Sequence, residues 1–148
     1  MEKVFHFDSA ADPYVADAAV LCCFDQRIRL AVYKFLQKRG ILRPDMIIVA
    51  GGAKTDFERD FILEQVRMSI LLHSTERISL MSHSDCATYG GLAAFGGDPE
   101  KEALHHKQEL HRAAQLIQDK FPEVRVECFF VTFEGIFAAL EQGVDQVA

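Results

Sequence analysis

The sequence predicts an α/β protein with an open, mainly parallel sheet of about four to five strands and helices on both faces. Short apolar runs bounded by turn residues indicate buried strands, and they alternate with stretches whose apolar residues recur at helical spacing. Short loops join most of these units, and strands that alternate with helices in this way pair in parallel. The length of 148 residues fits one domain over residues 1–148, long enough to bury a core without disulfides.

The N-terminal half contains two strand–helix units. In chain order they are a strand over residues 18–23, a helix over 28–39 that stops at Gly40, a strand over 46–50 and a helix ending near His73. Thr55 or Asp56 could cap the second helix. The tight loop Gly51-Gly52-Ala53-Lys54 lacks the pattern of a phosphate-binding P-loop, so we interpret it as a turn that lets backbone approach a neighbouring site.

The C-terminal half repeats the alternation with longer segments. It has a strand over residues 78–82, a glycine-rich stretch over 89–97, a helix over 99–120, a strand over 124–131 and a short helix over 133–140. The last of these strands alternates at first and then becomes wholly apolar, which suits a position at an edge of the sheet.

The charge pattern excludes some classes of partner. The net charge is −6, from 16 basic and 22 acidic residues without a long run of either sign, which argues against binding to nucleic acid or to an anionic membrane surface. Residues 1–4 lack the apolar region of a signal peptide, and no apolar stretch approaches the length of a membrane span. We therefore expect a cytoplasmic protein.

Suitable metal ligands follow two of the predicted strands. Cys23 closes the first strand, and His83 and Cys86 follow the third. The carboxyl ends of parallel strands meet at one edge of an open sheet, so these side chains should converge there, beside Gly51-Gly52. Two thiolates and one imidazole form the ligand set of a catalytic zinc, which keeps a fourth position open for water. The sequence predicts one Zn²⁺ per chain.

The other cysteines and histidines have simpler interpretations. Four cysteines would allow two disulfides, but a cytoplasmic chain of this length neither needs nor usually keeps them. Cys22 and Cys128 lie in apolar runs and should be buried, with Cys22 on the face opposite to Cys23. Three histidines of the long helix are too unevenly spaced for a second metal site, which favours a solvated helix; they are His105, His106 and His111.

Asp25 and Arg27 stand directly after the first ligand. An Asp-x-Arg sequence after a strand is most simply a helix N-cap with a solvated arginine, and the flanking Cys23 is what favours a catalytic pair. As such a pair, Asp25 would accept a hydrogen bond from a zinc-bound hydroxide, and Arg27 would hold Asp25 through a bidentate contact. Asp85, within the second half of the ligand set, is expected to cap the next turn.

Together these residues resemble the β-class carbonic anhydrases. The family carries C-x-D-x-R and, some distance on, H-x-x-C; this chain has Cys23-x-Asp25-x-Arg27 and His83-x-x-Cys86, with a looser match over about residues 17–92. The resemblance implies a zinc lyase that hydrates carbon dioxide to bicarbonate through a zinc-bound hydroxide, with Asp25 and Arg27 as the catalytic pair. It also implies a homodimer or higher homo-oligomer, because the family builds its pocket at a subunit interface. The 12 phenylalanines supply apolar surface to cover.

The chain departs from the family at several positions around the predicted pocket. Gln26 replaces a serine, Ala87 replaces a glycine, and Ala50-Gly51 stands where the family has arginine-asparagine. Only 22 residues precede Cys23, too few for the family's N-terminal helices. Two alternatives therefore stay open. One is a zinc hydrolase that attacks another small linear electrophile, such as carbon disulfide or carbonyl sulfide, and the other is a non-catalytic zinc-binding protein.

Overall fold

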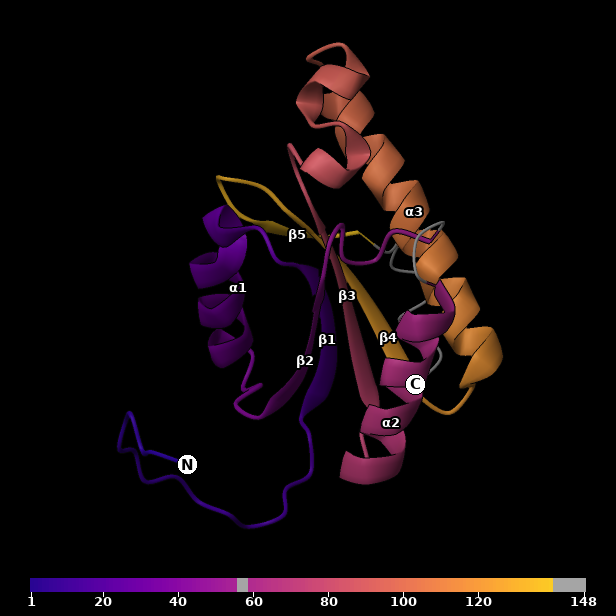
Figure 1. Ribbon diagram of the computed structural model, residues 1–148. Helices are drawn as coiled ribbons and strands as arrows, with labels where there is room; N and C mark the ends of the chain where they lie inside the picture. The colour runs from indigo at the N-terminus through magenta and orange to yellow at the C-terminus, as the bar shows by residue number, and fades with distance from the viewer. Residues whose placement is uncertain (56–58, 140–148) are drawn as a thin grey trace.

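The computed structural model describes residues 1–55 and 59–139. Its elements follow in the order β1 (Ala18–Cys23), α1 (Gln26–Lys38), β2 (Pro44–Val49), α2 (Arg59–His73), β3 (Arg77–His83), the short 3-10 helices η1 (Ala87–Tyr89) and η2 (Leu92–Phe95), α3 (Pro99–Lys120), β4 (Arg125–Val131) and β5 (Ile136–Ala138). The strands form one five-stranded sheet in the order β2-β1-β3-β4-β5 (Figure 1). The predicted α/β class with a mainly parallel sheet is confirmed, since only β5 runs antiparallel to its neighbour.

Helices cover both faces of the sheet (Figure 1). α1 lies on one face, and its buried residues are spaced four apart: Ile28, Val32 and Leu36. α2 and α3 lie on the other face, where Val66 and Leu110 join the core formed by Leu21 and Leu80. Val20, next to Leu21 on β1, belongs to the core under α1. The alternation of strand side chains therefore builds two cores, one on each side of the sheet.

Local chemistry sets the ends of α1 and α3. Asp25 caps α1, because its carboxylate accepts a hydrogen bond from the Arg27 N–H at 2.9 Å. The helix ends before Gly40, whose φ of 74° suits glycine. Asp98 caps α3, and Pro99 occupies its first turn. Proline lacks an N–H group, but the N–H at this position has no acceptor within a helix, so no hydrogen bond is lost.

The C-terminal segment differs from the prediction. The Thr132 hydroxyl accepts hydrogen bonds from the N–H groups of Glu134 and Gly135, which reverses the chain, and β5 then pairs with β4. The predicted short helix over 133–140 is wrong for residues 133–139, and residue 140 lies outside the described residues. β4 lies between β3 and β5, so the predicted edge position of this strand was also wrong.

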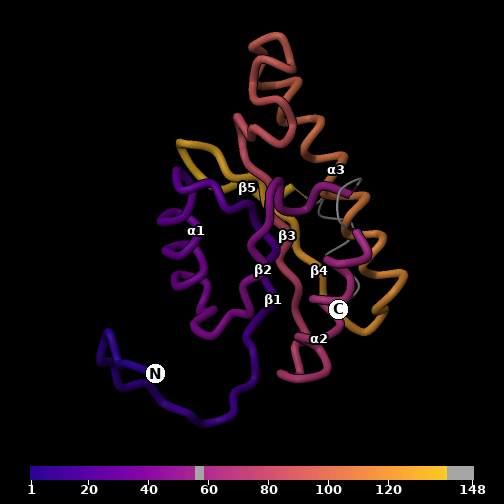
Figure 2. The backbone as a smooth tube through the Cα atoms, viewed as in Figure 1, coloured from indigo at the N-terminus to yellow at the C-terminus, as the bar shows by residue number. Residues whose placement is uncertain are grey.

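The second predicted helix and the N-terminal segment complete the fold. The helix is confirmed as α2, which ends at His73 as expected. Its alternative cap Asp56 lies outside the described residues, whereas Thr55 donates from its N–H and its hydroxyl to Glu109 of α3, at 3.3 and 3.1 Å. Residues 1–15 lie outside the sheet and are exposed (Figure 2). Among the described residues, no helix is both long and apolar enough to cross a membrane.

Candidate metal centre

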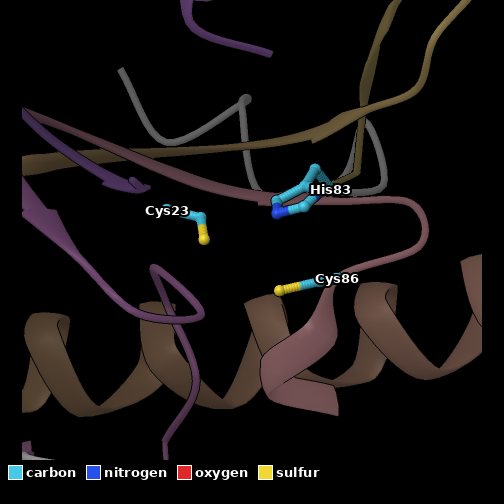
Figure 3. Close-up of side chains that lie close together, drawn as sticks. All are labelled: Cys23, His83 and Cys86. Atoms are coloured by element: carbon cyan, nitrogen blue, oxygen red, sulfur yellow. The ribbon is translucent and has the colours of Figure 1, made fainter. Parts of the chain in front are cut away.

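Three buried side chains converge at the carboxyl end of the sheet (Figure 3). The ligand atoms of Cys23, His83 and Cys86 all lie within 4.8 Å of one another. Cys23 and His83 are the last residues of β1 and β3, and Cys86 stands in the loop that follows β3. The structure brings together the three residues predicted as ligands, at separations that suit one metal ion.

The loop after β3 turns back to present Cys86. Asp85 has a φ of 54°, a left-handed conformation that aspartate tolerates better than most residues. The Cys86 carbonyl then accepts hydrogen bonds from the N–H groups of Tyr89 and Gly91, at 3.0 and 2.9 Å, which fixes the start of η1. This backbone geometry places the second thiol near the first.

His83 is oriented to bind through its Nε2 atom. Its Nδ1 lies 2.8 Å from the Ser84 carbonyl oxygen, which can only accept, so Nδ1 carries the proton. Nε2 then presents a lone pair, and this buried atom has no hydrogen-bond partner among the described residues. A buried polar atom left unpaired costs about 1–3 kcal/mol, which a bound metal ion would remove. Two sulfur atoms and one imidazole nitrogen form a donor set that fits zinc.

The two thiols differ in their electrostatics. The neighbouring Cys86 thiol lowers the pKa of Cys23 well below its ordinary value, and the N–H of Gly51, 3.4 Å from Cys23 Sγ, adds to the effect. The pKa of Cys86 is raised, because the Cys23 sulfur beside it and burial both disfavour a second negative charge. A divalent cation would let both sulfurs be thiolates at once.

Gly52 brings the loop after β2 against the candidate ligands. Its φ is 57°, and a Cβ atom there would lie 2.5 Å from the Met81 carbonyl oxygen and 3.0 Å from the Cys23 backbone nitrogen. A side chain has no space at this position. The expectation that Gly51-Gly52-Ala53-Lys54 lets backbone approach the site is confirmed.

Asp25 and Arg27 lie beside the three candidate ligands. The Arg27 guanidinium donates to Asp25 Oδ2 from Nε at 3.1 Å and from Nη2 at 2.7 Å, and this pairing lowers the pKa of Asp25 to about 2. Asp25 Oδ2 is 3.9 Å from His83 Nε2, so the carboxylate lies beside the nitrogen atom expected to bind the metal. The helix cap is confirmed, the Arg27 side chain is 48% exposed as the simpler interpretation expected, and the bidentate pair coexists with both.

A second carboxylate that binds Arg27 was not expected from the sequence. Asp85 Oδ2 accepts from Arg27 Nη1 at 3.0 Å, while its other oxygen accepts at 2.9 Å from the N–H of Leu92, the first residue of η2. The predicted cap of the next turn was wrong, because that turn is η1, whose N-cap residue is Cys86 and which has no side-chain cap. Glu102, buried in the first turn of α3, accepts from the Asp85 N–H at 2.6 Å. Acidic residues are common in a first helical turn for electrostatic reasons alone, so no sequence signal marks this contact.

The remaining cysteines and histidines lie outside the ligand group. Cys22 and Cys128 are buried, as predicted, and all four cysteines are free. The prediction of a solvated α3 was wrong for His106, which is fully buried and stacks on Phe130 with ring centroids 5.1 Å apart. Burial lowers the pKa of His106 to about 4. The other two histidines of the helix are half-buried: His105 and His111.

A cavity of about 210 Å³ opens beside Cys23, between α1 and the β1–β2 side of the sheet. Its walls are mainly apolar and include Phe24, Ile28 and Met46, and Asp25 also lines it. One candidate ligand, Cys23, therefore borders a mainly apolar opening, and Asp25 borders the same opening.

Comparison with known proteins identifies the family. Residues 15–140 match the family described as "putative carbonic anhydrase". The chain belongs to this carbonic anhydrase family. The match includes both halves of the ligand set and all five strands.

Relatives in sequence have no described activity. An uncharacterized protein of Rickettsia bellii is 31% identical over 67 residues, which are 44% of this chain and 41% of that protein. An uncharacterized protein of Rickettsia conorii is 30% identical over 67 residues, 44% of this chain and 36% of that protein. The chain matches less than half the length of either relative.

Solved structures share the fold. A carbonic anhydrase of Streptococcus mutans has a TM-score of 0.65 at 15% identity, over 90% of this chain and 88% of its own. A β-carbonic anhydrase of Trichomonas vaginalis has a TM-score of 0.58 at 13% identity, over 92% and 88%. A carbon disulfide hydrolase has a TM-score of 0.59 at 13% identity, over 92% and 84%. The expected β-carbonic anhydrase fold is confirmed.

Replacing Cys23 with serine should abolish stoichiometric zinc binding, because a serine hydroxyl stays protonated at neutral pH and only two ligands remain. Cys128→Ser is the control, since it changes a buried cysteine of the core under α2 and α3 and should keep one zinc per chain. Metal analysis of the purified proteins, with circular dichroism to confirm folding, tests this. A folded Cys23→Ser variant with full zinc would show that the ligand assignment is wrong.

Replacing Gly52 with alanine should push the loop away from Met81 and Cys23 and weaken both folding and zinc binding. Gly40→Ala is the matched control, because Gly40 also has a positive φ, 74°, but a Cβ atom there meets nothing within 4 Å. Gly40→Ala reports backbone strain alone, of about 1 kcal/mol, and Gly52→Ala should cost roughly 1–3 kcal/mol more through overlap. Urea unfolding and zinc titration measure both effects. Equal losses would contradict the close approach.

Proposed function

We propose that this chain is a zinc enzyme that hydrates carbon dioxide to bicarbonate and a proton. One observation carries the proposal: the Asp25 carboxylate, paired with Arg27, lies 3.9 Å from His83 Nε2, the unpartnered nitrogen of the candidate ligand group among the described residues. Structural zinc sites are closed by four protein ligands, whereas catalytic sites keep one position open. A carboxylate held beside an open position can accept a hydrogen bond from a nucleophile bound there, whereas as a fourth ligand the same carboxylate would close the site.

The residues of the site have separate tasks. Cys23, His83 and Cys86 would hold zinc, which when bound lowers the pKa of a water on its open position and supplies a nucleophile near neutral pH. With its pKa near 2, Asp25 can only accept hydrogen bonds at that pH, so it fixes the orientation of a nucleophile that donates to it. Arg27 holds the carboxylate through Nε and Nη2 and keeps it directed at the site.

The cavity beside Cys23 supports a small, uncharged substrate. Its volume is about 210 Å³, and its walls include Phe24, Ile28 and Met46. A charged substrate would lose hydrogen bonds to water on entering, and apolar walls of this kind offer none in exchange. Carbon dioxide is small, linear and uncharged, so it suits such an opening.

Two alternatives need separate assays. The shared fold with a carbon disulfide hydrolase motivates tests with carbon disulfide and carbonyl sulfide. A chain that binds one zinc and turns over none of the three substrates would be a zinc-binding protein without this chemistry. Zinc stoichiometry followed by stopped-flow hydration and sulfide-release assays on the same preparation separates these functions.

The surface around the cavity suits a second copy of the chain. Phe24 and Ile48 are 61% and 45% exposed, Leu30 is exposed on α1, and β2 is an edge strand. Phe24 and Ile48 both line the cavity, and exposed apolar residues that gather in this way mark interaction surfaces. We therefore propose a homodimer that buries this surface and closes the opening of the cavity.

Sedimentation at micromolar concentration should show a dimer for the wild type and a shift to monomer for Leu30→Glu, because a charge placed in an apolar contact loses its hydration. Leu104→Glu is the control, since Leu104 is 57% exposed, against 66% for Leu30, but lies on α3. A monomeric wild type, or the same shift in both variants, would contradict this interface.

A cytoplasmic location accords with the proposed ligands. All four cysteines are free, and Cys23 and Cys86 can bind a metal ion only while reduced. The thiol-reducing conditions of the cytoplasm keep such a pair available.

Asp25→Asn should keep one zinc per chain and lose about two to four powers of ten in the rate of carbon dioxide hydration, the usual contribution of a positioned acid–base group. Asparagine caps a helix about as well as aspartate, so a purely structural Asp25 would tolerate the change. Asp119→Asn, at the exposed end of α3, makes the same substitution elsewhere and serves as the control. Wild-type hydration rates in Asp25→Asn would remove Asp25 from the mechanism.

A further inference from the structure

Arg27 is held by two carboxylates. Its Nη2 donates to Asp25 Oδ2 at 2.7 Å, and its Nη1 donates to Asp85 Oδ2 at 3.0 Å. Nη2 also donates to the Asp85 carbonyl oxygen at 3.0 Å. The centre of the Phe133 ring lies 5.0 Å from the guanidinium carbon, so an aromatic face adds a further contact. The guanidinium is fixed on several sides although the Arg27 side chain is 48% exposed.

Asp85 is itself fixed by the loop and by α3. Its Oδ1 accepts from the Leu92 N–H at 2.9 Å, and its own N–H donates to Glu102 at 2.6 Å. Glu102 is buried, so this contact is shielded from water. A Cβ atom at Gly91 would lie 2.9 Å from Asp85 Oδ1, which shows how closely the loop encloses the carboxylate.

We propose that Asp85 is a positioning residue, which holds Arg27 in the one orientation that directs Asp25 at the metal-binding space and which Glu102 anchors to α3. This role rests on the proposed function, in which the direction of Asp25 matters. An exposed pair of one arginine and one carboxylate is weak and adopts other geometries. A guanidinium that lies between two carboxylates can donate to both of them in only one orientation, so the second carboxylate fixes that orientation.

The two oxygens of Asp85 allow this role to be separated from a structural one. Oδ1 serves the turn through Leu92, and Oδ2 serves Arg27. Asparagine keeps the turn, because its carbonyl oxygen can accept from Leu92 and it tolerates a positive φ. Its amide NH₂ then faces a guanidinium that has only donors. Asp85→Asn therefore removes the side-chain contact to Arg27, leaves the contact to the backbone carbonyl of residue 85, and preserves the loop.

Asp85→Asn should keep one zinc per chain and the wild-type unfolding midpoint, while kcat/KM for carbon dioxide hydration falls about tenfold to a hundredfold, the loss typical of a small misplacement. Asp119→Asn should leave kcat/KM unchanged. Because Asp85 acts through Arg27, adding Asp85→Asn to Arg27→Ala should cause no further loss. Wild-type kcat/KM in Asp85→Asn, or losses that multiply in the double variant, would overturn the proposal.

A measurement on Arg27 alone distinguishes failure of this inference from failure of the proposed function. In the zinc-loaded protein, solvent exchange of the Arg27 Nε–H, measured by nuclear magnetic resonance, should become several-fold faster in Asp85→Asn. The Arg67 Nε–H, bonded to Glu64 at 2.9 Å, is the internal control and should keep its rate. A wild type that is inactive on every substrate refutes the proposed function, and the exchange rate still decides the role of Asp85. An unchanged Arg27 rate overturns the positioning role whether or not the enzyme is active.

Discussion

The site depends on the parallel pairing of β1 with β3. Leu21 pairs with Leu80 in this register, so the two strands end side by side at Cys23 and His83. Two candidate ligands that are distant in sequence are therefore neighbours before any loop is placed. The third ligand then needs only the turn at Asp85. Parallel strands bring their carboxyl ends to one edge, and this constraint makes a short chain able to assemble the whole ligand group there.

Helix capping and the candidate chemistry use the same atoms. Asp25 starts α1 by accepting from the Arg27 N–H, and the same carboxylate accepts from the Arg27 guanidinium. The hydrogen bond from the Arg27 side chain stabilises the charged form of Asp25 and is the largest cause of its lowered pKa. A structural and a functional interpretation of an Asp-x-Arg sequence are consequently not exclusive. The helix holds the carboxylate next to the metal-binding space because the cap requires it there.

Local patterns in the sequence predicted most of the fold and the proximity of Cys23, His83 and Cys86, whose role as metal ligands stays a prediction. Alternating strands and helices, and polar residues at strand ends, place Cys23, His83 and Cys86 without any knowledge of long-range contacts. The hairpin that makes β5 depends on hydrogen bonds of the Thr132 hydroxyl, which compete with a helical pattern of similar apolar residues. The second carboxylate on Arg27 is a contact between residues 58 apart in the chain, and no local signal encodes it.

The burial of polar residues on α3 was also not predicted from the sequence. These buried residues hold the two loops that flank the candidate ligands. Glu102 and Glu109 are seven residues apart, which places them on one face of the helix, and both are buried. Glu102 accepts from Asp85 in the loop that carries Cys86, while Glu109 accepts from Thr55 in the loop that carries Gly51-Gly52. One helix thus ties down both loops that flank the candidate ligands. Both carboxylates are buried, and a buried acceptor that loses a donor costs about 1–3 kcal/mol, so each loop is held by a contact that is expensive to break. The position of α3 on the sheet is therefore part of the geometry of the metal centre, although α3 supplies none of the three ligands assigned to it.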